Sequence, residues 1–152
     1  NKKLDEDINS DIRAILFNTS GQGKKFDVFY DICNQFRKQL SKKKIIIKCG
    51  NLNNFRDFMH VEDVAEGLFF LSKKGVPGQS YNIGSSNLIK ISKIIDILRK
   101  KYNKSISLKI EKKLLRKYDE KFISASINKI KKLGWKPIKK IDDIILDMIN
   151  QN

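Results

Sequence analysis

The sequence has few of the residues from which metal centres and disulfide scaffolds are built. Its 152 residues include one histidine, His60, and two cysteines, Cys33 and Cys49, with fifteen residues between them. A single histidine excludes a site made of several histidines, and the cysteine spacing fits no common zinc motif. Two isolated cysteines are typical of a reduced protein, so we expect a cytoplasmic location and no metal site.

Long apolar runs are missing as well. The apolar runs that do occur, such as Gly67 to Leu71 and Ile144 to Leu146, are far shorter than the roughly 20 residues that span a membrane. The first residues, Asn1 to Asp7, lack the apolar core of a secretory signal. Because the chain has no internal repeat and 40% hydrophobic residues, we interpret residues 1–152 as a single domain and expect no membrane association.

Acidic residues are scarce beside basic ones. Lysine and arginine number 32 against 17 acidic residues, which gives a formal net charge of +15. Such an excess is typical of nucleic-acid-binding proteins. It also follows from general lysine richness, as in Lys42-Lys43-Lys44, and we favour that explanation. The large aromatic residues sit among apolar neighbours and are expected in the core, not on a base-stacking surface: Phe55, Phe58, Phe69, Phe70 and Trp135. Nucleic-acid binding stays the lesser alternative.

Hydrophobic periodicity predicts strands that alternate with helices. Expected helices lie at 27–40, 61–73 and 91–102, with two more that follow Ser126 and Asp142 as N-caps. Expected strands lie at 12–18, which we take as buried, and at 45–47, 81–84 and 105–110, and residues 55–60 are expected to form a short strand or an extended loop. In the second helix Val64, Leu68 and Leu71 form the predicted buried stripe. The alternation indicates an α/β fold.

No complete active site is visible in the residues. Gly21-Gln22-Gly23 begins like a dinucleotide-binding loop, but Phe26 stands where a third glycine permits close helix–strand packing. The loop still offers backbone N–H groups and two lysines to a phosphate. His60 has no nucleophile-elbow pattern near it and is expected to be structural. The carboxylate pairs Asp119-Glu120 and Asp142-Asp143 are expected to be solvated or to cap helices.

The most specific run extends from Gly50 to Ala65 and places Arg56-Asp57 between apolar residues. The planar guanidinium of arginine suits a bidentate grip on a phosphate. An arginine beside an aspartate also suits a buried structural ion pair, and the residues alone leave both interpretations open. Asp57 and Asp63 are candidates to restrain the loop or to cap the next helix.

Five segments together resemble the extended short-chain dehydrogenase/reductase family, the NAD-dependent epimerases and dehydratases of nucleotide sugars. One of them, Arg56 to Asp63, matches the family pattern R-D-[FYW]-x-x-V-x-D. The others are Arg13 to Gly21, Tyr81 to Ser85, Arg116 to Asp119 and Leu133 to Pro137. The resemblance implies an α/β fold made of the last strands of a Rossmann-type sheet and a small α/β substrate-binding domain.

The resemblance also implies a ligand and roles for four residues. Within the family, Gly50-Asn51-Leu52 is most similar to the GDP-mannose 4,6-dehydratase and GDP-4-keto-6-deoxymannose reductase branch. The implied ligand is a nucleoside-diphosphate sugar, with a GDP-sugar favoured. Asn18 is expected to hydrogen-bond near its pyrophosphate, and Arg56 and Arg116 to bind the pyrophosphate. Asp119 is expected to accept from the ribose hydroxyls.

The same resemblance implies that the catalytic half of the enzyme lies outside this chain. The family's cofactor glycines and its Tyr/Lys acid–base pair precede the matching segment, and none of the four tyrosines here has a lysine four residues later. We therefore expect NAD or NADP in the full-length parent enzyme, bound by an N-terminal Rossmann half and not by this chain. A non-catalytic scaffold is a further alternative. Without the N-terminal half, the strands near Ile15 and Tyr81 would lack the neighbouring strands of the full sheet and would expose their edges. We therefore expect the isolated chain to be marginally stable.

Overall fold

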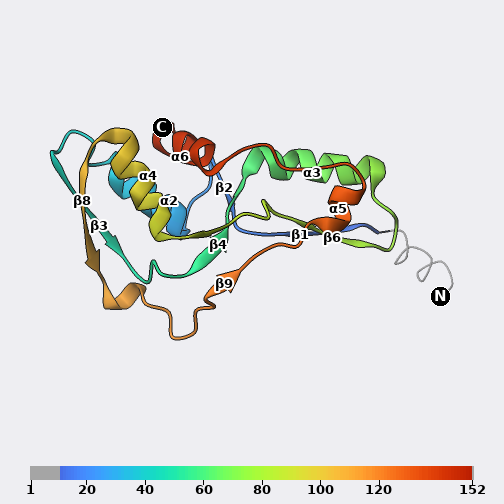
Figure 1. The fold of residues 1–152 in the computed structure, drawn as a ribbon, viewed down its shortest axis with the longest axis horizontal. Helices are drawn as coiled ribbons and strands as arrows, with labels where there is room; N and C mark the ends of the chain where they lie inside the picture. Colours follow the sequence, from blue (N-terminus) through green and yellow to red (C-terminus); the bar gives the residue numbers. More distant parts are fainter. Residues whose placement is uncertain (1–10, 152) are drawn as a thin grey trace.

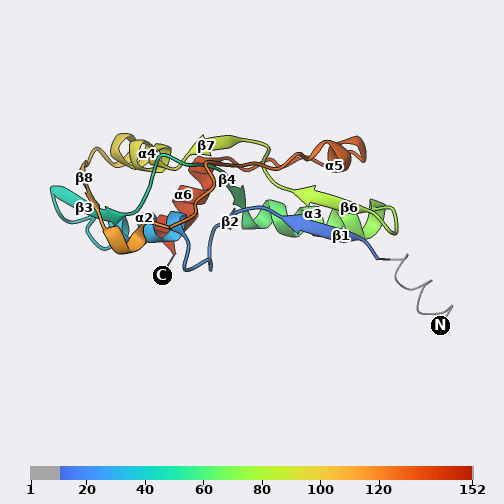
Figure 2. The same ribbon diagram turned by 90° about the horizontal axis from the view of Figure 1, so that it is seen from below.

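The computed structural model describes residues 11–151. The molecule is elongated, with a group of helices and strands at each end and short strands between them (Figures 1 and 2). The elements in chain order are β1 (Arg13–Leu16), β2 (Thr19–Ser20), α2 (Val28–Arg37), β3 (Lys44–Cys49), β4 (Phe55–Asp57), β5 (Met59–His60), α3 (Val61–Lys74), β6 (Ser80–Ile83), β7 (Leu88–Lys90), α4 (Ser92–Tyr102), β8 (Ser105–Ile110), the 3-10 helix η1 (Lys112–Leu114), β9 (Phe122–Ile123), α5 (Asn128–Lys132) and α6 (Ile141–Asn150). This order confirms the mixed α/β fold.

One end of the molecule is built on the parallel strands β1 and β6, against which α3 and α5 pack. Its core consists of Met59, Val64, Leu71, Tyr81, Ile83, Ala125, Ile127, Ile130 and Trp135. The predicted burial of the 12–18 strand is wrong, because Ile15 and Leu16 are 49% and 48% exposed. Among the described residues β1 pairs with β6 alone, so its other edge has no neighbouring strand.

The other end contains the parallel strands β3 and β8, covered by α2, α4 and α6. Alternate side chains of β3 are buried, as expected for a strand with one face toward helices. This larger core includes the fully buried residues Phe29, Ile32, Phe36, Ile45, Ile47, Ile94, Ile95, Leu98, Ile145 and Met148. The predicted helix at 27–40 is confirmed as α2 in shorter form, and Asp27 is its N-cap.

Helix α2 and the turn that follows it also occupy the free edge of β3. The carboxamides of Gln35, in the helix, and Gln39, in the turn, each form two hydrogen bonds with the β3 backbone. Gln35 bonds the N–H and C=O of Lys48 at 2.8 and 2.9 Å. Gln39 bonds those of Ile46 at 3.2 and 2.9 Å. The two side chains thus satisfy backbone groups of β3 that a neighbouring strand would otherwise bond, and they hold β3 against the helix.

Short strands join the two ends. The strands β7, β4 and β9 form one sheet, in which Arg56 lies opposite Ile89 on one side and Ile123 on the other. The strands β2 and β5 form a separate parallel pair. Residues from these short strands and from the loops beside them build the site described below.

Two predicted N-caps are wrong. Helix α5 begins at Asn128, two residues after Ser126, and no side chain caps it. Helix α6 begins at Ile141, and Oδ2 of Asp143 accepts from the N–H of Lys140 at 2.7 Å. The capping carboxylate is therefore the second of the Asp142-Asp143 pair.

Helix α3 ends before Gly75, as predicted, but its buried face differs from the predicted stripe. Leu68, a member of that stripe, is 41% exposed. The expectation that Phe69 lies in the core is also wrong, because it is 67% exposed. The helix turns Gly67 toward the core instead, where the ring of Trp135 lies against its backbone. Among the described helices, none has the length and apolar character needed to cross a membrane.

Candidate functional site

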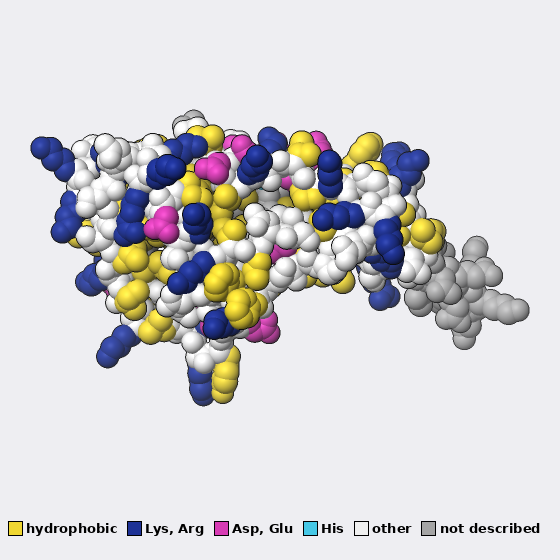
Figure 3. Space-filling model, in the orientation of Figure 1, with side chains coloured by type: hydrophobic (Ala, Val, Ile, Leu, Met, Phe, Trp, Pro, Cys, Tyr) yellow, Lys and Arg dark blue, Asp and Glu magenta, His cyan; other side chains and the backbone are white. Residues whose placement is uncertain are grey.

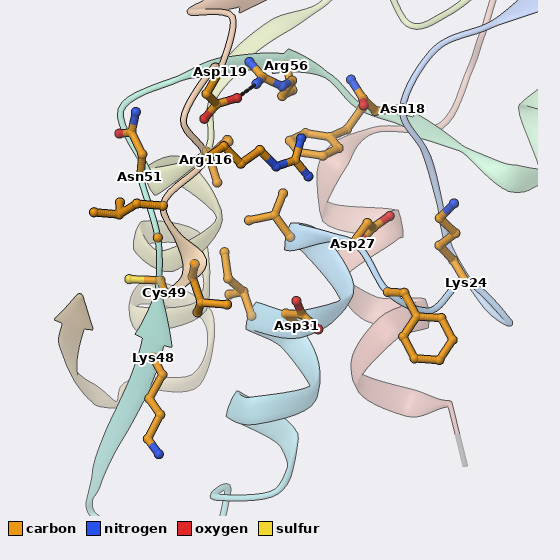
Figure 4. A pocket seen from close by; sticks show the side chains of 18 of the residues that line it. Asn18, Lys24, Asp27, Asp31, Lys48, Cys49, Asn51, Arg56, Arg116 and Asp119 are labelled. Atoms are coloured by element: carbon orange, nitrogen blue, oxygen red, sulfur yellow. Dashed lines mark hydrogen bonds and ion pairs between the residues drawn. The ribbon is translucent and has the colours of Figure 1, made fainter. Parts of the chain in front are cut away.

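A cavity of about 420 Å³ opens between the loop after β1, the first turn of α2, the end of β3 and the segment after η1. Four residues with a role implied by resemblance all line this cavity: Asn18, Arg56, Arg116 and Asp119 (Figure 4). They come from three distant parts of the sequence. The fold therefore brings together every residue of the expected substrate site.

Arg56 is held firmly by the protein itself. Only 9% of its side chain is exposed. Its Nη1 donates to the carbonyl oxygens of Phe55 and Glu120, both at 2.8 Å. Its Nη2 donates to Oδ1 of Asp119 at 2.7 Å. Three of the five guanidinium N–H donors are used in this way, which leaves two for a ligand.

Asp119 has both carboxylate oxygens engaged. Besides Arg56 on Oδ1, Nδ2 of Asn54 donates to Oδ2 at 2.5 Å. The expectation that Asp119 is solvated or caps a helix is wrong, because its carboxylate forms an ion pair with Arg56. Arg56 therefore pairs with Asp119 and not with the adjacent Asp57. Asn54 has no signal in the sequence that marks it as a partner, since 65 positions separate it from Asp119.

The Arg116 guanidinium and the Asn18 amide nitrogen are the donor groups of the site that have no partner among the described residues. Arg116 is exposed, and no hydrogen bond or ion pair joins its side chain to the described residues. Figure 4 shows its guanidinium pointing into the middle of the cavity. Nδ2 of Asn18 has no hydrogen-bond partner, and it is the only buried side-chain N or O atom of residues 11–151 of which this is true. A buried donor without a partner is costly unless something binds there.

The cavity carries a surplus of positive charge. Its basic side chains are Lys24, Lys48, Arg56, Lys113 and Arg116, and its acidic ones are Asp27, Asp31 and Asp119. Apolar residues such as Val28, Ile32 and Phe58 form the rest of the wall. Burial, and to a lesser extent the charge of Asp27, raises the pKa of Asp31. The lining suits an anionic ligand with one flat apolar part.

Gly50 sets the distance between two walls of the cavity. A Cβ atom added at this position would lie 2.3 Å from the carbonyl oxygen of Leu114. Because that neighbour is backbone, it has no flexible side chain that can move aside. The glycine therefore lets the segment after β8 pass directly over the end of β3.

Asp57 restrains the loop next to the site. It is fully buried and accepts hydrogen bonds from the N–H groups of Ser85, Ser86 and Ala125 at 2.8, 3.0 and 3.1 Å. The Ser85 hydroxyl donates to it at 2.5 Å. Asp63, the second candidate, accepts instead from the N–H of Lys139 at 2.9 Å. Both carboxylates restrain loops, which confirms one of the two roles considered for them.

His60 is structural, as expected. It is 2% exposed, its Nδ1 accepts from the N–H of Glu62 at 3.1 Å, and its Nε2 lies 3.0 Å from Oδ2 of Asp147. A tautomer with the proton on Nε2 satisfies both contacts. The side chains of His60, Glu62 and Asp147 are close enough to share an ion. The hydrogen bonds already occupy both ring nitrogens, so these residues have no ligand atom of His60 to offer.

The glycine loop contributes only its end to the cavity. Lys24 and Phe26 line it, whereas Gly21, Gly23 and Lys25 do not. The N-terminus of α2 is occupied by the carboxylate of Asp27, whose Oδ1 accepts from the N–H of Tyr30 at 2.7 Å. A dinucleotide pyrophosphate placed there would meet a negative charge, so the loop does not fit the group that its glycines suggest.

Comparison with known proteins agrees with this architecture. A family model described as GDP-mannose 4,6 dehydratase matches residues 8–148. The dTDP-glucose 4,6-dehydratase of Escherichia coli is 46% identical over 44 residues, which are 29% of this chain and 12% of that protein.

Two solved structures resemble the fold. RMD from Pseudomonas aeruginosa, complexed with NADPH, aligns with a TM-score of 0.79 and 22% identity over 91% of this chain and 46% of that chain. The UDP-glucose 4-epimerase of Thermotoga maritima with UDP-glucose aligns with a TM-score of 0.70 and 20% identity over 91% and 44% of the two chains.

This chain thus spans less than half of the length of these relatives. The family model covers nearly all of it, and the Rossmann-type neighbours have the same arrangement of strands and helices. The chain belongs to this family, the extended short-chain dehydrogenase/reductase type of NAD-dependent epimerases and dehydratases.

Proposed function

We propose that this chain is the nucleotide-sugar-binding part of an NAD(P)-dependent sugar-nucleotide epimerase, dehydratase or reductase. One observation carries the proposal. Asn18, Arg56, Arg116 and Asp119, which the family resemblance singled out, line a single cavity. In this proposal residues 1–152 are the C-terminal, substrate-binding part of the enzyme.

The pyrophosphate of the ligand is assigned to Arg116 and Asn18. Arg116 is an unpaired cation that points into the cavity, and Asn18 holds an unpartnered amide donor. Arg56 contributes its two remaining donors. A dianion among these groups gains charge-assisted hydrogen bonds and satisfies the buried amide. Asp119 keeps lone pairs that are free to accept from a ribose diol.

We propose guanine as the base. The Gly50-Asn51-Leu52 segment supports it, and so does the family model, whose description names GDP-mannose. The carboxylate of Asp31 lies in the cavity without a hydrogen-bond partner among the described residues. Guanine presents adjacent N–H donors that match a carboxylate, whereas uracil presents one N–H between two carbonyl oxygens.

In this proposal the nicotinamide cofactor binds to residues outside this cavity. Relatives of the fold include a structure complexed with NADPH, but the capped N-terminus of α2 does not fit a dinucleotide. When bound to the enzyme, NAD or NADP supplies hydride transfer. The residues described here bind and orient the nucleotide sugar.

Calorimetric titration tests the proposal. The chain is titrated with GDP-mannose, UDP-glucose, dTDP-glucose and a short DNA duplex at two salt concentrations. We expect saturable binding of a nucleotide sugar that is lost in Arg116→Ala and kept in Arg13→Ala, because Arg13 is an exposed arginine on β1 outside the cavity. Binding of DNA alone, weakening steeply with salt, would favour the nucleic-acid alternative.

A further inference from the structure

Asn54 is a buried polar residue to which the family resemblance gives no role. It is 4% exposed. Its Nδ2 donates to Oδ2 of Asp119 at 2.5 Å, and its Oδ1 accepts from Nδ2 of Asn51 at 3.1 Å. The backbone carbonyl oxygen of Asn54 accepts from the N–H of Ile91 at 2.9 Å. Because a carboxylate only accepts, the orientation of the Asn54 amide is fixed.

Asp119 lies on a segment with little support of its own. Residues 112–118 are exposed, and the described chain has no helix or strand between η1 and β9. Two nearby bonds anchor the segment: the N–H of Phe55 donates to the carbonyl of Lys121, and Arg56 donates to that of Glu120, both at 2.8 Å. Both bonds end on backbone atoms, so they place the chain without orienting the carboxylate.

The carboxylate of Asp119 needs two donors to be fixed in one plane. Held by Arg56 on Oδ1 alone, it is free to turn about its Cβ–Cγ bond. A second donor on Oδ2 removes that freedom. Asn54 is neutral, so it supplies this donor without adding a charge that would compete with Arg56 or with a ligand.

We propose that Asn54 is a positioning residue of the nucleotide-sugar site, which orients Asp119 toward both Arg56 and the ribose diol of the ligand. The inference rests on the proposed function. It makes ribose recognition depend on a carboxamide that touches no part of the ligand. Asn51, which contacts Oδ1 of Asn54, completes the chain of hydrogen bonds from the end of β3 to Arg56.

Asn54→Asp distinguishes a role in orienting the Asp119 carboxylate from a general structural role of Asn54. It puts a carboxylate within hydrogen-bond distance of Asp119, and the two share a proton with a raised macroscopic pKa. At pH 8 we expect GDP-mannose, or UDP-glucose if that is the sugar bound, to bind roughly tenfold more weakly. As the pH falls toward 5, the shared proton restores the donor and affinity recovers. Asn53→Asp, at the exposed neighbour, is the matched control and lacks this pH-dependent defect.

A second readout compares the nucleoside diphosphate of the sugar that binds, GDP or UDP, with its 2′,3′-dideoxy form. We expect wild type to bind the ribose form more tightly, and Asn54→Leu to lower that preference at every pH while its circular dichroism matches that of wild type. Equal pH profiles for Asn54→Asp and Asn53→Asp, or an undiminished ribose preference in Asn54→Leu, would overturn this inference and leave the proposed function standing. Failure of wild type to bind either nucleotide sugar would overturn both.

Discussion

Arg56 and Asp119 form an ion pair across the rim of the cavity, with Nη2 of the arginine 2.7 Å from Oδ1 of the aspartate. The pair joins β4 to a segment that has no regular structure of its own. Arg56 adds bonds to two carbonyl oxygens, so its guanidinium acts as a three-point clamp. The side chain of Arg116 has no hydrogen-bond or ion-pair partner among the described residues. The two arginines therefore have different tasks, one fixing the wall and one free for a ligand.

Arg56→Lys tests the clamp. Lysine keeps the charge, but its single ammonium does not span Phe55, Glu120 and Asp119 at once. We expect peptides from 112–121 to exchange amide hydrogens faster, with a loss of about 1–2 kcal/mol in the free energy of unfolding. Arg13→Lys is the control. Unchanged exchange in Arg56→Lys would show that the guanidinium does not hold the segment.

Asp57→Asn tests the loop restraint beside the site. The new amide group faces N–H donors, so buried hydrogen bonds are lost without replacement. We expect the free energy of unfolding to fall by about 2–3 kcal/mol, followed in urea through the fluorescence of Trp135, the single tryptophan. Asp96 forms an exposed ion pair with Arg99, so Asp96→Asn should change the free energy of unfolding by less than about 0.5 kcal/mol. Equal effects would contradict the assignment.

Gly50→Ala tests the contact between the cavity walls. The added methyl group must push the Leu114 backbone away, because the calculated approach of 2.3 Å is far below contact distance. Overpacking of this kind costs about 1–3 kcal/mol. We expect a lower melting temperature together with weaker nucleotide-sugar binding. A variant as stable as wild type, with unchanged affinity, would show that the walls are not coupled at this point.

Asp31→Asn tests the choice of base. The asparagine amide presents one acceptor where the carboxylate presents two, and its NH2 group opposes the guanine donors. We expect roughly tenfold weaker binding of GDP-mannose in calorimetry. UDP-glucose serves as the internal control, since its base does not use this carboxylate in our account. Parallel losses for both ligands would remove Asp31 from base recognition.

We expect the buried thiol of Cys33 to lower the stability of the protein at alkaline pH. Burial, and secondarily Asp27, raises the pKa of its thiol. Above the unfolded thiol pKa of about 8.5, the unfolded chain releases a proton that the folded chain keeps, so ionisation favours unfolding. Stability is therefore full below this pH and declines above it, by up to about 1.4 kcal/mol per pH unit. Urea unfolding between pH 8 and 10 should have a shallower pH dependence in Cys33→Ala; an equal slope would contradict the prediction.

The sequence predicted the features that depend on residues close together in the chain. Helix α2, the ends of α3 and the structural role of His60 follow from spacing and neighbours. Burial of β1 was predicted wrongly, since an apolar run looks the same whether or not a second strand covers it. The cap of α6 was predicted wrongly because two adjacent aspartates lie at its start and Asp143, not Asp142, makes the capping bond. The cap of α5 was predicted wrongly because the helix begins at Asn128, beyond the reach of the predicted Ser126 cap, without a side-chain cap.

The site itself was visible only through family resemblance. Spacing alone left Arg56 open between a phosphate grip and an ion pair, and the structure supplies its internal partner from more than sixty positions away. Asn54 and Gly50 had no local signal, because their importance comes from Asp119 and Leu114, which folding brings beside them. Contacts between distant segments are the information that pattern and periodicity do not carry.

A crystal structure of the chain soaked with GDP-mannose, and separately with UDP-glucose, tests the central claim most directly. We predict that one of them is bound with its pyrophosphate within hydrogen-bond distance of Arg116 and of Nδ2 of Asn18, and its ribose beside Asp119. A nucleotide sugar bound elsewhere, or in this cavity with its phosphates away from Arg116, would contradict the account.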